Sequence, residues 1–136
     1  MIIEKARQLR KLIKDFAMQS EDKTLVIGFK DYFEAWKPSA YNVGDVRLDA
    51  SGYPKECIVA HDSTVNTDWN IDVVTLWKPY HSRMKEYALP YVAPTGSHDI
   101  YKVGEYAVWK DGNVYKCVID TNFNPTEHSQ AWEIAE

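Results

Sequence analysis

The sequence predicts an α+β fold in which an N-terminal helical segment precedes two small antiparallel β modules of about three strands each. Two observations support this prediction. Apolar residues near the N-terminus recur at helical spacing. Farther along, YNVGDVRLDASGYPKEC (residues 41–57) is followed 60 residues later by the similar stretch YKVGEYAVWKDGNVYKC (residues 101–117), with no gap between the two. Self-similarity at a constant offset indicates a duplicated structural unit.

The repeat and the prolines set the predicted domain boundaries. Pro38 lies shortly before the first copy, and proline both ends helices and favours an extended residue before it. Between the two copies, residues 79–100 contain three prolines and one glycine, which indicates an ordered linker. We therefore divide the chain into a helical segment, a first β module, a linker and a second β module, with bounds 1–34, 35–80, 81–97 and 98–136.

Residues 2–18 are predicted to form an amphipathic helix. Their apolar side chains are spaced alternately by four and three residues, which is the a/d pattern of a helix that packs along one stripe. Such a helix either packs on its own domain or assembles with copies of itself, and both alternatives stay open. For the assembly we expect a homo-oligomer, preferably a trimer. The predicted oligomerisation stripe consists of Ile2, Ala6, Leu9, Ile13 and Phe16.

A second, shorter helix is expected after a break at residues 19–23. Ser20 or Asp22 can supply the side-chain oxygen that caps this helix at its N-terminus. Gly28 weakens the helix by up to ~1 kcal/mol relative to alanine. The helical hairpin should end near Glu34, and the apolar side chains of its second arm are Leu25, Val26, Phe29, Tyr32 and Phe33.

Each β module is expected to contain a hairpin and a closing strand. Asp111-Gly112 is a favourable hairpin turn, and Gly52 marks the corresponding turn of the first copy. A tryptophan closes each copy at an offset of 55, so the first copy carries a loop five residues longer. The residues interpreted as the structural core of the repeat are Tyr41, Gly44, Gly52, Cys57, Trp77, Tyr101, Gly104, Gly112, Tyr115, Cys117 and Trp132.

The cysteines and the acidic residues do not indicate catalysis. Cys57 and Cys117 occupy equivalent positions of the repeat, so each should lie inside its own module as a small buried apolar residue rather than in a disulfide. Zinc needs about four ligands, and the sequence has no Cys-x-x-Cys pair or close histidine pair. No nucleophile–base set, paired-carboxylate motif or phosphate loop is recognisable. We expect a non-enzymatic protein without a metal or cofactor.

Charge and hydropathy exclude further classes of partner. The net charge is −4, which argues against a general nucleic-acid binder. Residues 1–33 carry seven basic and five acidic side chains, a net +2, and the remainder carries a net −6. No apolar run reaches the ~18–20 residues of a membrane span, so no membrane partner is expected. The charged N-terminus is unlike a signal peptide, which predicts synthesis and retention in a cytoplasm until release.

The pattern Tyr-x-x-Gly-Asp/Glu, a turn glycine, a cysteine and a late Trp-Glu-Ile resembles the family 5/12 carbohydrate-binding modules, the small chitin-binding-type domains of chitinases and cellulases. The second copy fits best, as YKVGEYAVWKDGNVYKC followed by AWEIAE. The whole chain, with a helical N-terminus and then AWKP, YNVGD and APTGSHDIYKVGE in that order, is similar to small structural proteins of tailed bacteriophages and prophages.

This resemblance implies a virion accessory protein of the tail, baseplate or capsid, made in the bacterial host cytoplasm and displaying two glycan-binding-like modules. Its expected partners are other virion proteins and a host-surface or environmental polysaccharide, such as a cell-wall glycan. The alternative is a purely structural tail or capsid protein whose modules dock other proteins. One departure concerns the exposed tryptophan pair of chitinase-type modules, whose positions here hold Ile119 and Asp120 in one copy and Val59 and Ala60 in the other.

Aromatic residues present in only one copy are the candidates for stacking on sugars. Sugar rings lie with their C–H faces on aromatic rings, while polar side chains meet the hydroxyl groups. Each such aromatic could instead anchor a loop, join the modules or dock a protein. The glycan-binding candidates are Trp109, Phe123, Trp69 and Tyr53, with the polar neighbours Asn122 and Asn124.

Overall fold

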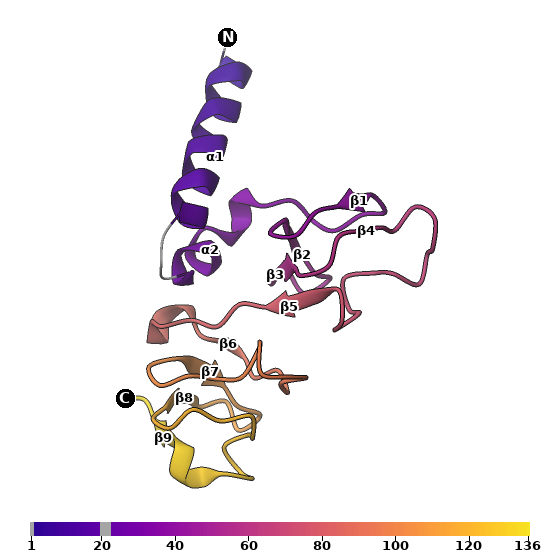
Figure 1. Cartoon of the computed structure of the whole chain (residues 1–136). Coiled ribbons are helices and arrows are strands. Elements are labelled where there is room, and N and C mark those ends of the chain that lie inside the picture. The colour runs from indigo at the N-terminus through magenta and orange to yellow at the C-terminus, as the bar shows by residue number, and fades with distance from the viewer. Residues whose placement is uncertain (1, 20–22) are drawn as a thin grey trace. The chain divides into compact units, whose positions relative to one another are not determined.

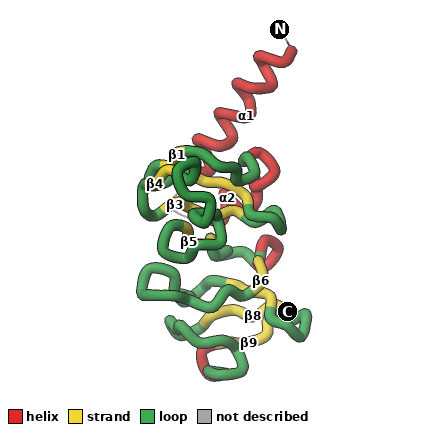
Figure 2. The backbone as a smooth tube through the Cα atoms, turned by 90° about the vertical axis from the view of Figure 1, so that its right-hand side faces the viewer, coloured by secondary structure: helices red, strands yellow, loops and turns green. Residues whose placement is uncertain are grey.

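The computed structural model describes residues 2–19 and 23–136, without the side chain of Ile2. The predicted helix cap at Ser20 or Asp22 lies outside these residues. The fold is α+β, with one long helix followed by small, mainly antiparallel sheets, as the sequence predicts (Figure 1). The chain divides into two compact units, Met1–Tyr80 and His81–Glu136. Loops make up most of the backbone of both β modules (Figure 2).

The first unit begins with three helical elements, α1 (Ile2–Gln19), α2 (Thr24–Gly28) and the 3-10 helix η1 (Lys30–Tyr32). α1 packs against α2 and η1. The buried side chains of this helical part include Ala17, Val26, Ile27 and Phe33. The Lys23 ammonium donates to the Met18 carbonyl in the last turn of α1. Within the described parts of the chain, no helix is both long and apolar enough to cross a membrane.

The predicted apolar stripe of α1 does not form one continuous surface. Leu9 and Phe16 are 57% and 63% exposed, and Ala6 is also exposed. Ile13 is half-buried and Ala17 is fully buried. α2 and η1 therefore cover the side of α1 that carries Ala17 and leave most of the predicted stripe uncovered. The alternative in which the helix packs on its own domain thus holds for the side that carries Ala17, and assembly with other copies stays a prediction.

The first module (residues 35–80) contains a three-stranded antiparallel sheet of order β2-β3-β5 and a short antiparallel pair, β1-β4. β2 and β3 form the predicted hairpin around Gly52, and β5 begins at Trp77, the predicted closing residue. An isolated parallel bridge joins Ala35 to Leu48 at the other edge of β2. The strands are β1 (Ala40–Tyr41), β2 (Val46–Leu48), β3 (Pro54–Cys57), β4 (His61–Asp62) and β5 (Trp77–Pro79).

The second module (residues 81–136) contains a four-stranded sheet of order β6-β7-β8-β9. β6 pairs parallel to β7, whereas the other pairs are antiparallel. Two 3-10 helices precede β6 and β9. The elements are η2 (Lys85–Tyr87), β6 (Leu89–Pro90), β7 (Tyr106–Val108), β8 (Val114–Cys117), η3 (Ser129–Ala131) and β9 (Trp132–Ile134).

The predicted linker, residues 81–97, is part of the second module, and we correct that interpretation. β6 lies within this segment, and Ser82 bridges to Tyr106 at the start of β7. Proline suggested a connector because it cannot donate a backbone hydrogen bond. An edge strand, however, is paired on one side only and therefore tolerates Pro90. The sheet consequently has one strand more than the three expected.

The two modules repeat the same backbone hydrogen bonds. The Gly44 N–H donates to the Cys57 carbonyl at 2.9 Å, and Gly104 donates to Cys117 at the same distance. Gly44 and Gly104 have φ of 96° and 95°, a region that favours glycine because it lacks a Cβ. Both cysteine N–H groups in turn donate to the carbonyl of the acidic residue after the glycine, at 2.8 and 2.7 Å. The repeat in the sequence is therefore a repeat of backbone geometry.

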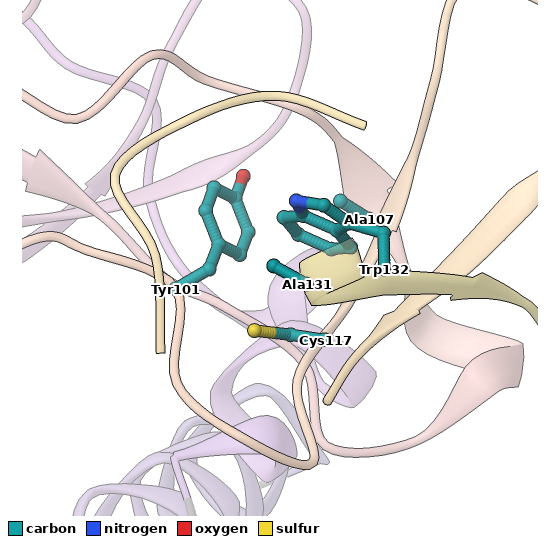
Figure 3. Packing of buried hydrophobic residues seen from close by; sticks show 5 residues of the cluster. All are labelled: Tyr101, Ala107, Cys117, Ala131 and Trp132. Atoms are coloured by element: carbon teal, nitrogen blue, oxygen red, sulfur yellow. The ribbon is translucent and has the colours of Figure 1, made fainter. Parts of the chain in front are cut away.

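Each module has its own small aromatic core. In the second module, the rings of Tyr101 and Trp132 lie 5.1 Å apart, with Ala131 and Cys117 beside them (Figure 3). Tyr115 is half-buried and packs against this cluster. The first module buries Tyr41, Cys57, Ile71 and Trp77 together. Both cysteines are free and buried, and each thiol donates to the carbonyl two residues ahead.

Candidate functional site

The four aromatic candidates differ in how much of each ring reaches solvent. Phe123 is 49% exposed and Trp69 is 38% exposed. Trp109 and Tyr53 are half-buried. Phe123 and Trp109 belong to the second module, and Trp69 and Tyr53 to the first, so the candidates form two separate sets. Phe123 offers the largest exposed fraction of an aromatic ring outside the helices.

The backbone around Phe123 is held in place by hydrogen bonds on both sides of the residue. The Phe123 N–H donates to Thr121 Oγ1 at 3.0 Å, and Thr121 is itself buried and bridged to Tyr101. On the other side, Trp132 Nε1 donates to the Phe123 carbonyl at 3.1 Å. Since Tyr101 and Trp132 are core residues, the core fixes the base of this loop, while the phenyl ring stays largely exposed.

The exposed ring borders a shallow hollow of about 510 Å³ lined by Phe123, Glu127 and His128. The imidazole of His128 lies edge-on to the phenyl ring, with centroids 6.4 Å apart, and its Nδ1 is 3.2 Å from Thr121 Oγ1. The Glu127 carboxylate is exposed and accepts the Asn124 N–H at 3.3 Å. The hollow thus combines one apolar ring with a carboxylate and an imidazole.

The two asparagines beside Phe123 have different roles. Asn124 Oδ1 accepts the backbone N–H groups of Thr126 and Glu127 at 2.9 and 2.8 Å, so this side chain builds the turn that follows. Asn122 is exposed next to Phe123 in the chain, and it is not among the residues that line the hollow. Asn124 therefore shapes the loop, whereas Asn122 remains a candidate on the basis of its exposure.

Trp109 is half-buried and contacts Tyr91, which packs against the core of the second module. Its indole lies edge-on to the ring of Tyr91, with centroids 5.3 Å apart, and the Lys110 ammonium lies 5.3 Å from the indole centroid. Tyr91 in turn stacks on Tyr101 and contacts Trp132. Trp109 is thus one end of a row of aromatic contacts that runs through Tyr91 to Trp132, whose indole holds the Phe123 carbonyl. Removing Trp109 would disturb this row as well as any ligand.

The first module carries no aromatic residue at the position equivalent to Phe123. At the 60-residue offset Phe123 corresponds to Ser63, which is buried and whose hydroxyl donates to the Ser39 carbonyl. Trp69 instead lies in the longer loop and contacts the edge of the His61 ring at a centroid distance of 6.5 Å. Tyr53 lies in the hairpin, where its N–H donates to the Asp49 side chain. The two modules therefore display aromatics at different places.

The positions that hold the tryptophan pair in chitinase-type modules are exposed and carry no aromatic ring. Val59 and Ile119 are both 48% exposed, and Asp120 accepts the Val103 N–H at 2.8 Å. Val43 and Val103 are likewise exposed, at 67% and 52%. Both modules thus expose an aliphatic side chain, Val59 or Ile119, at the first of these positions, where a stacking platform would require an aromatic ring.

Sequence reasoning missed four side chains of the second module. His81 stacks on Tyr101 with centroids 3.7 Å apart, and its Nδ1 lies 3.0 Å from Glu105 Oε1. Tyr91 covers the other side of the cluster. The Tyr91 N–H donates to the Val108 carbonyl, as the Trp36 N–H does to the Leu48 carbonyl. The sequence signal that could have identified Tyr91 is therefore an aromatic residue shortly before each copy of the repeat. No comparable signal identifies His81, Glu127 or His128.

The hairpin tip of the second module carries the clearest electrostatic pairing on an exposed loop. Asp111 accepts the Asn113 N–H at 2.9 Å and the Tyr115 hydroxyl at 2.8 Å, and these two hydrogen bonds lower the pKa of Asp111. The hydrogen bond from the Tyr115 hydroxyl to Asp111 raises the pKa of Tyr115. Among the residues described, no three His, Cys, Asp or Glu side chains are grouped to hold a metal ion.

No protein-family model and no curated protein matches this chain.

Proposed function

We propose that the chain is a non-enzymatic accessory protein of a tailed-phage virion, and that its second module binds polysaccharide at the Phe123 hollow. One observation carries the glycan proposal: an exposed phenyl ring on a fixed loop, at a hollow that a carboxylate and an imidazole also line. An apolar surface with a few polar groups at its rim is the usual composition of a small-molecule site. The phage assignment rests on the order of motifs along the chain.

The fixed backbone favours weak but specific binding of a rigid sugar ring. Since the loop is already ordered by the Thr121 and Trp132 hydrogen bonds, little conformational entropy is lost when a ligand stacks on Phe123. The hollow is shallow and presents one exposed aromatic ring, so each site should bind weakly. Several copies on one particle would bind a repetitive polysaccharide more tightly through effective concentration.

The test is a pull-down of the purified full chain with insoluble glycans: bacterial cell walls, peptidoglycan, chitin and cellulose. Phe123→Ala should lose most of the bound fraction, because the stacking surface is removed. Ile119→Ala is the matched control, since Ile119 is 48% exposed and Phe123 is 49% exposed in the same module. Binding that survives salt, falls with Phe123→Ala and persists with Ile119→Ala supports the proposal. Binding that is equal in all three chains contradicts the Phe123 site.

A second candidate function is protein docking within the virion, favoured by exposed aliphatic side chains at equivalent positions of the two modules: Val43 and Val59 in the first, and Val103 and Ile119 in the second. Exposed apolar groups of this kind suit a protein partner better than a sugar. If no glycan is retained by the folded wild-type chain, this second function takes precedence. Its test is incorporation into particles, which Ile119→Asp should reduce and Phe123→Ala should leave unchanged.

A further inference from the structure

The exposed face of α1 differs from the stripe that the sequence predicts. Leu9, Leu12 and Phe16 are 57%, 67% and 63% exposed and lie three and four residues apart, on one side of the helix. Lys5 and Gln19 continue the same spacing toward the two ends, and both are exposed. We call these five residues the α1 seam. Its members follow one another at intervals of four, three, four and three residues, which is heptad spacing.

The other side of α1 is occupied by its own chain. Ala17 is fully buried there, Arg10 Nη1 donates to the Tyr32 carbonyl at 3.3 Å, and Lys14 lies 4.0 Å from the Glu34 carboxylate. The Arg10 guanidinium also lies over the Tyr32 ring at 5.8 Å. Two cations of α1 therefore interact with the segment Tyr32–Glu34 on this side of the helix and not with the seam.

The charges that flank the seam suit a second copy of the same helix. In the seam frame, the e and g positions hold Ala6, Gln8, Ile13 and Asp15, none of which is basic. The predicted stripe would instead place Lys5 and Arg10 at flanking positions, where like charges meet in a homomeric coiled coil. Since Lys11 pairs with Asp15 at 2.8 Å, the flanks carry little net charge. An acidic partner or an anionic lipid surface would require several basic side chains, and the α1 seam contains one, Lys5.

We propose that two copies of the chain associate through their α1 seams as an antiparallel, two-fold symmetric pair. This direction sets Lys5 against Phe16 of the partner subunit, and Leu9 against Leu12 of the partner subunit. A lysine ammonium over an aromatic face is attractive. A parallel pair would bring Lys5 against Lys5 of the partner subunit, where the two charges repel. The antiparallel direction is therefore favoured, because it gives the Lys5 ammonium an attractive contact in place of a repulsive one.

The pair should be weak and should depend on protein concentration. α1 has 18 residues and is therefore about 27 Å long, and the seam buries much less than the ~1,600 Å² of a standard interface. A two-fold contact of this kind closes on itself and gives a dimer rather than a chain of subunits. This inference is independent of the proposed glycan site, because the seam lies on α1 and the Phe123 hollow on the second module.

Sedimentation velocity of the full chain over a hundredfold range of concentration tests the pair. We expect a monomer–dimer equilibrium in the micromolar range, shifted at least tenfold toward monomer by Leu12→Gln. Ile3→Gln is the matched control: Ile3 is 70% exposed on the same helix but lies nine residues from Leu12, which is two and a half turns and thus the opposite face. Ile3→Gln should leave the equilibrium unchanged.

Oxidative cross-linking tests the direction of the helices. Chains carrying Lys5→Cys and chains carrying Phe16→Cys are mixed; the antiparallel pair predicts that the disulfide forms mainly between the two different variants. Cys57 and Cys117 are fully buried and should not interfere. A monomer at every concentration, a trimer, a dimer insensitive to Leu12→Gln, or cross-links mainly within the Lys5→Cys variant would each overturn the proposal.

Discussion

The two β modules share a backbone but stabilise their central tyrosine differently. Tyr41 meets Trp77 edge-on and lies under the Arg47 guanidinium, at 5.0 and 5.3 Å. Tyr101 is stacked by both His81 and Tyr91 and contacts Trp132. The glycine–cysteine hydrogen bonds are nearly identical in the two modules. This difference shows that the backbone of the unit is set by a few positions, while the side chains around the tyrosine could diverge.

The surfaces diverged further than the cores. In the second module the Trp132 indole donates a hydrogen bond to the Phe123 loop. In the first module Trp77 Nε1 is buried and has no hydrogen-bond partner among the residues that the structure describes. In the first module the longer loop carries Trp69, whose indole contacts the His61 ring of β4. If the proposed glycan site is correct, the two modules bind unequally, and the second module is the one to be tested first.

The largest expected effect is loss of a closing tryptophan. Trp132→Ala and Trp77→Ala should each lower the free energy of unfolding by about 3–5 kcal/mol, since both indoles are almost fully buried. Hydrogen exchange measured on peptides should show lost protection mainly in the module that carries the change. Equal loss in both modules would show that the two units unfold together, and unchanged protection would contradict the core described here.

The next effect distinguishes the two indole N–H groups. Trp132→Phe removes the hydrogen bond to the Phe123 carbonyl, whereas Trp77→Phe removes an N–H that has no partner in the described part of the chain. The free energy of unfolding should therefore fall further for Trp132→Phe, by about 1–2 kcal/mol relative to Trp77→Phe. Urea unfolding of both variants measures the difference. An equal cost would mean that the Trp132 hydrogen bond adds nothing to stability.

A smaller effect is expected at the equivalent glycines. Gly44→Ala and Gly104→Ala both place a Cβ at positive φ, which costs about 1 kcal/mol. A Cβ at Gly44 meets nothing within 4 Å, but one at Gly104 would lie 2.6 Å from Arg83 Nη2 and must displace that side chain. Urea unfolding should thus find Gly104→Ala the costlier change. If Gly44→Ala lowered the free energy of unfolding more than Gly104→Ala, the contact with Arg83 would not be what decides the cost.

The smallest effect at neutral pH concerns the buried thiols. Burial raises the pKa of Cys117 to about 11 and also raises that of Cys57. Above about pH 9 the unfolded chain loses the thiol proton while the folded chain keeps it, so the free energy of unfolding should fall from there to about pH 11. Urea unfolding across this range should show that the free energy of unfolding falls less steeply with pH in Cys117→Ala than in the unchanged chain. In Cys57→Ala the slope should differ less from that of the unchanged chain. Parallel curves for all three chains would contradict this linkage.

Local patterns predicted much of the fold. The paired glycines, the hairpin turns and the equivalent cysteines follow from rules that involve few neighbouring residues, and their positions in the structure agree with the repeat. Phe123 could be selected as a site candidate because it occurs in one copy only. His128 and Glu127 could not be selected, since they approach Phe123 through a turn whose shape depends on Asn124.

The sequence by itself determined the α+β class, the duplication and the long amphipathic helix, because periodicity and turn residues act over short distances. Tertiary structure decided three things that no local rule contains. It added β6 to the second sheet, since strand pairing joins residues far apart in the chain. It chose His81 and Tyr91 as the stacking partners of Tyr101. Finally, packing against α2 and η1 selected which face of α1 is covered and left the seam of Leu9, Leu12 and Phe16 exposed.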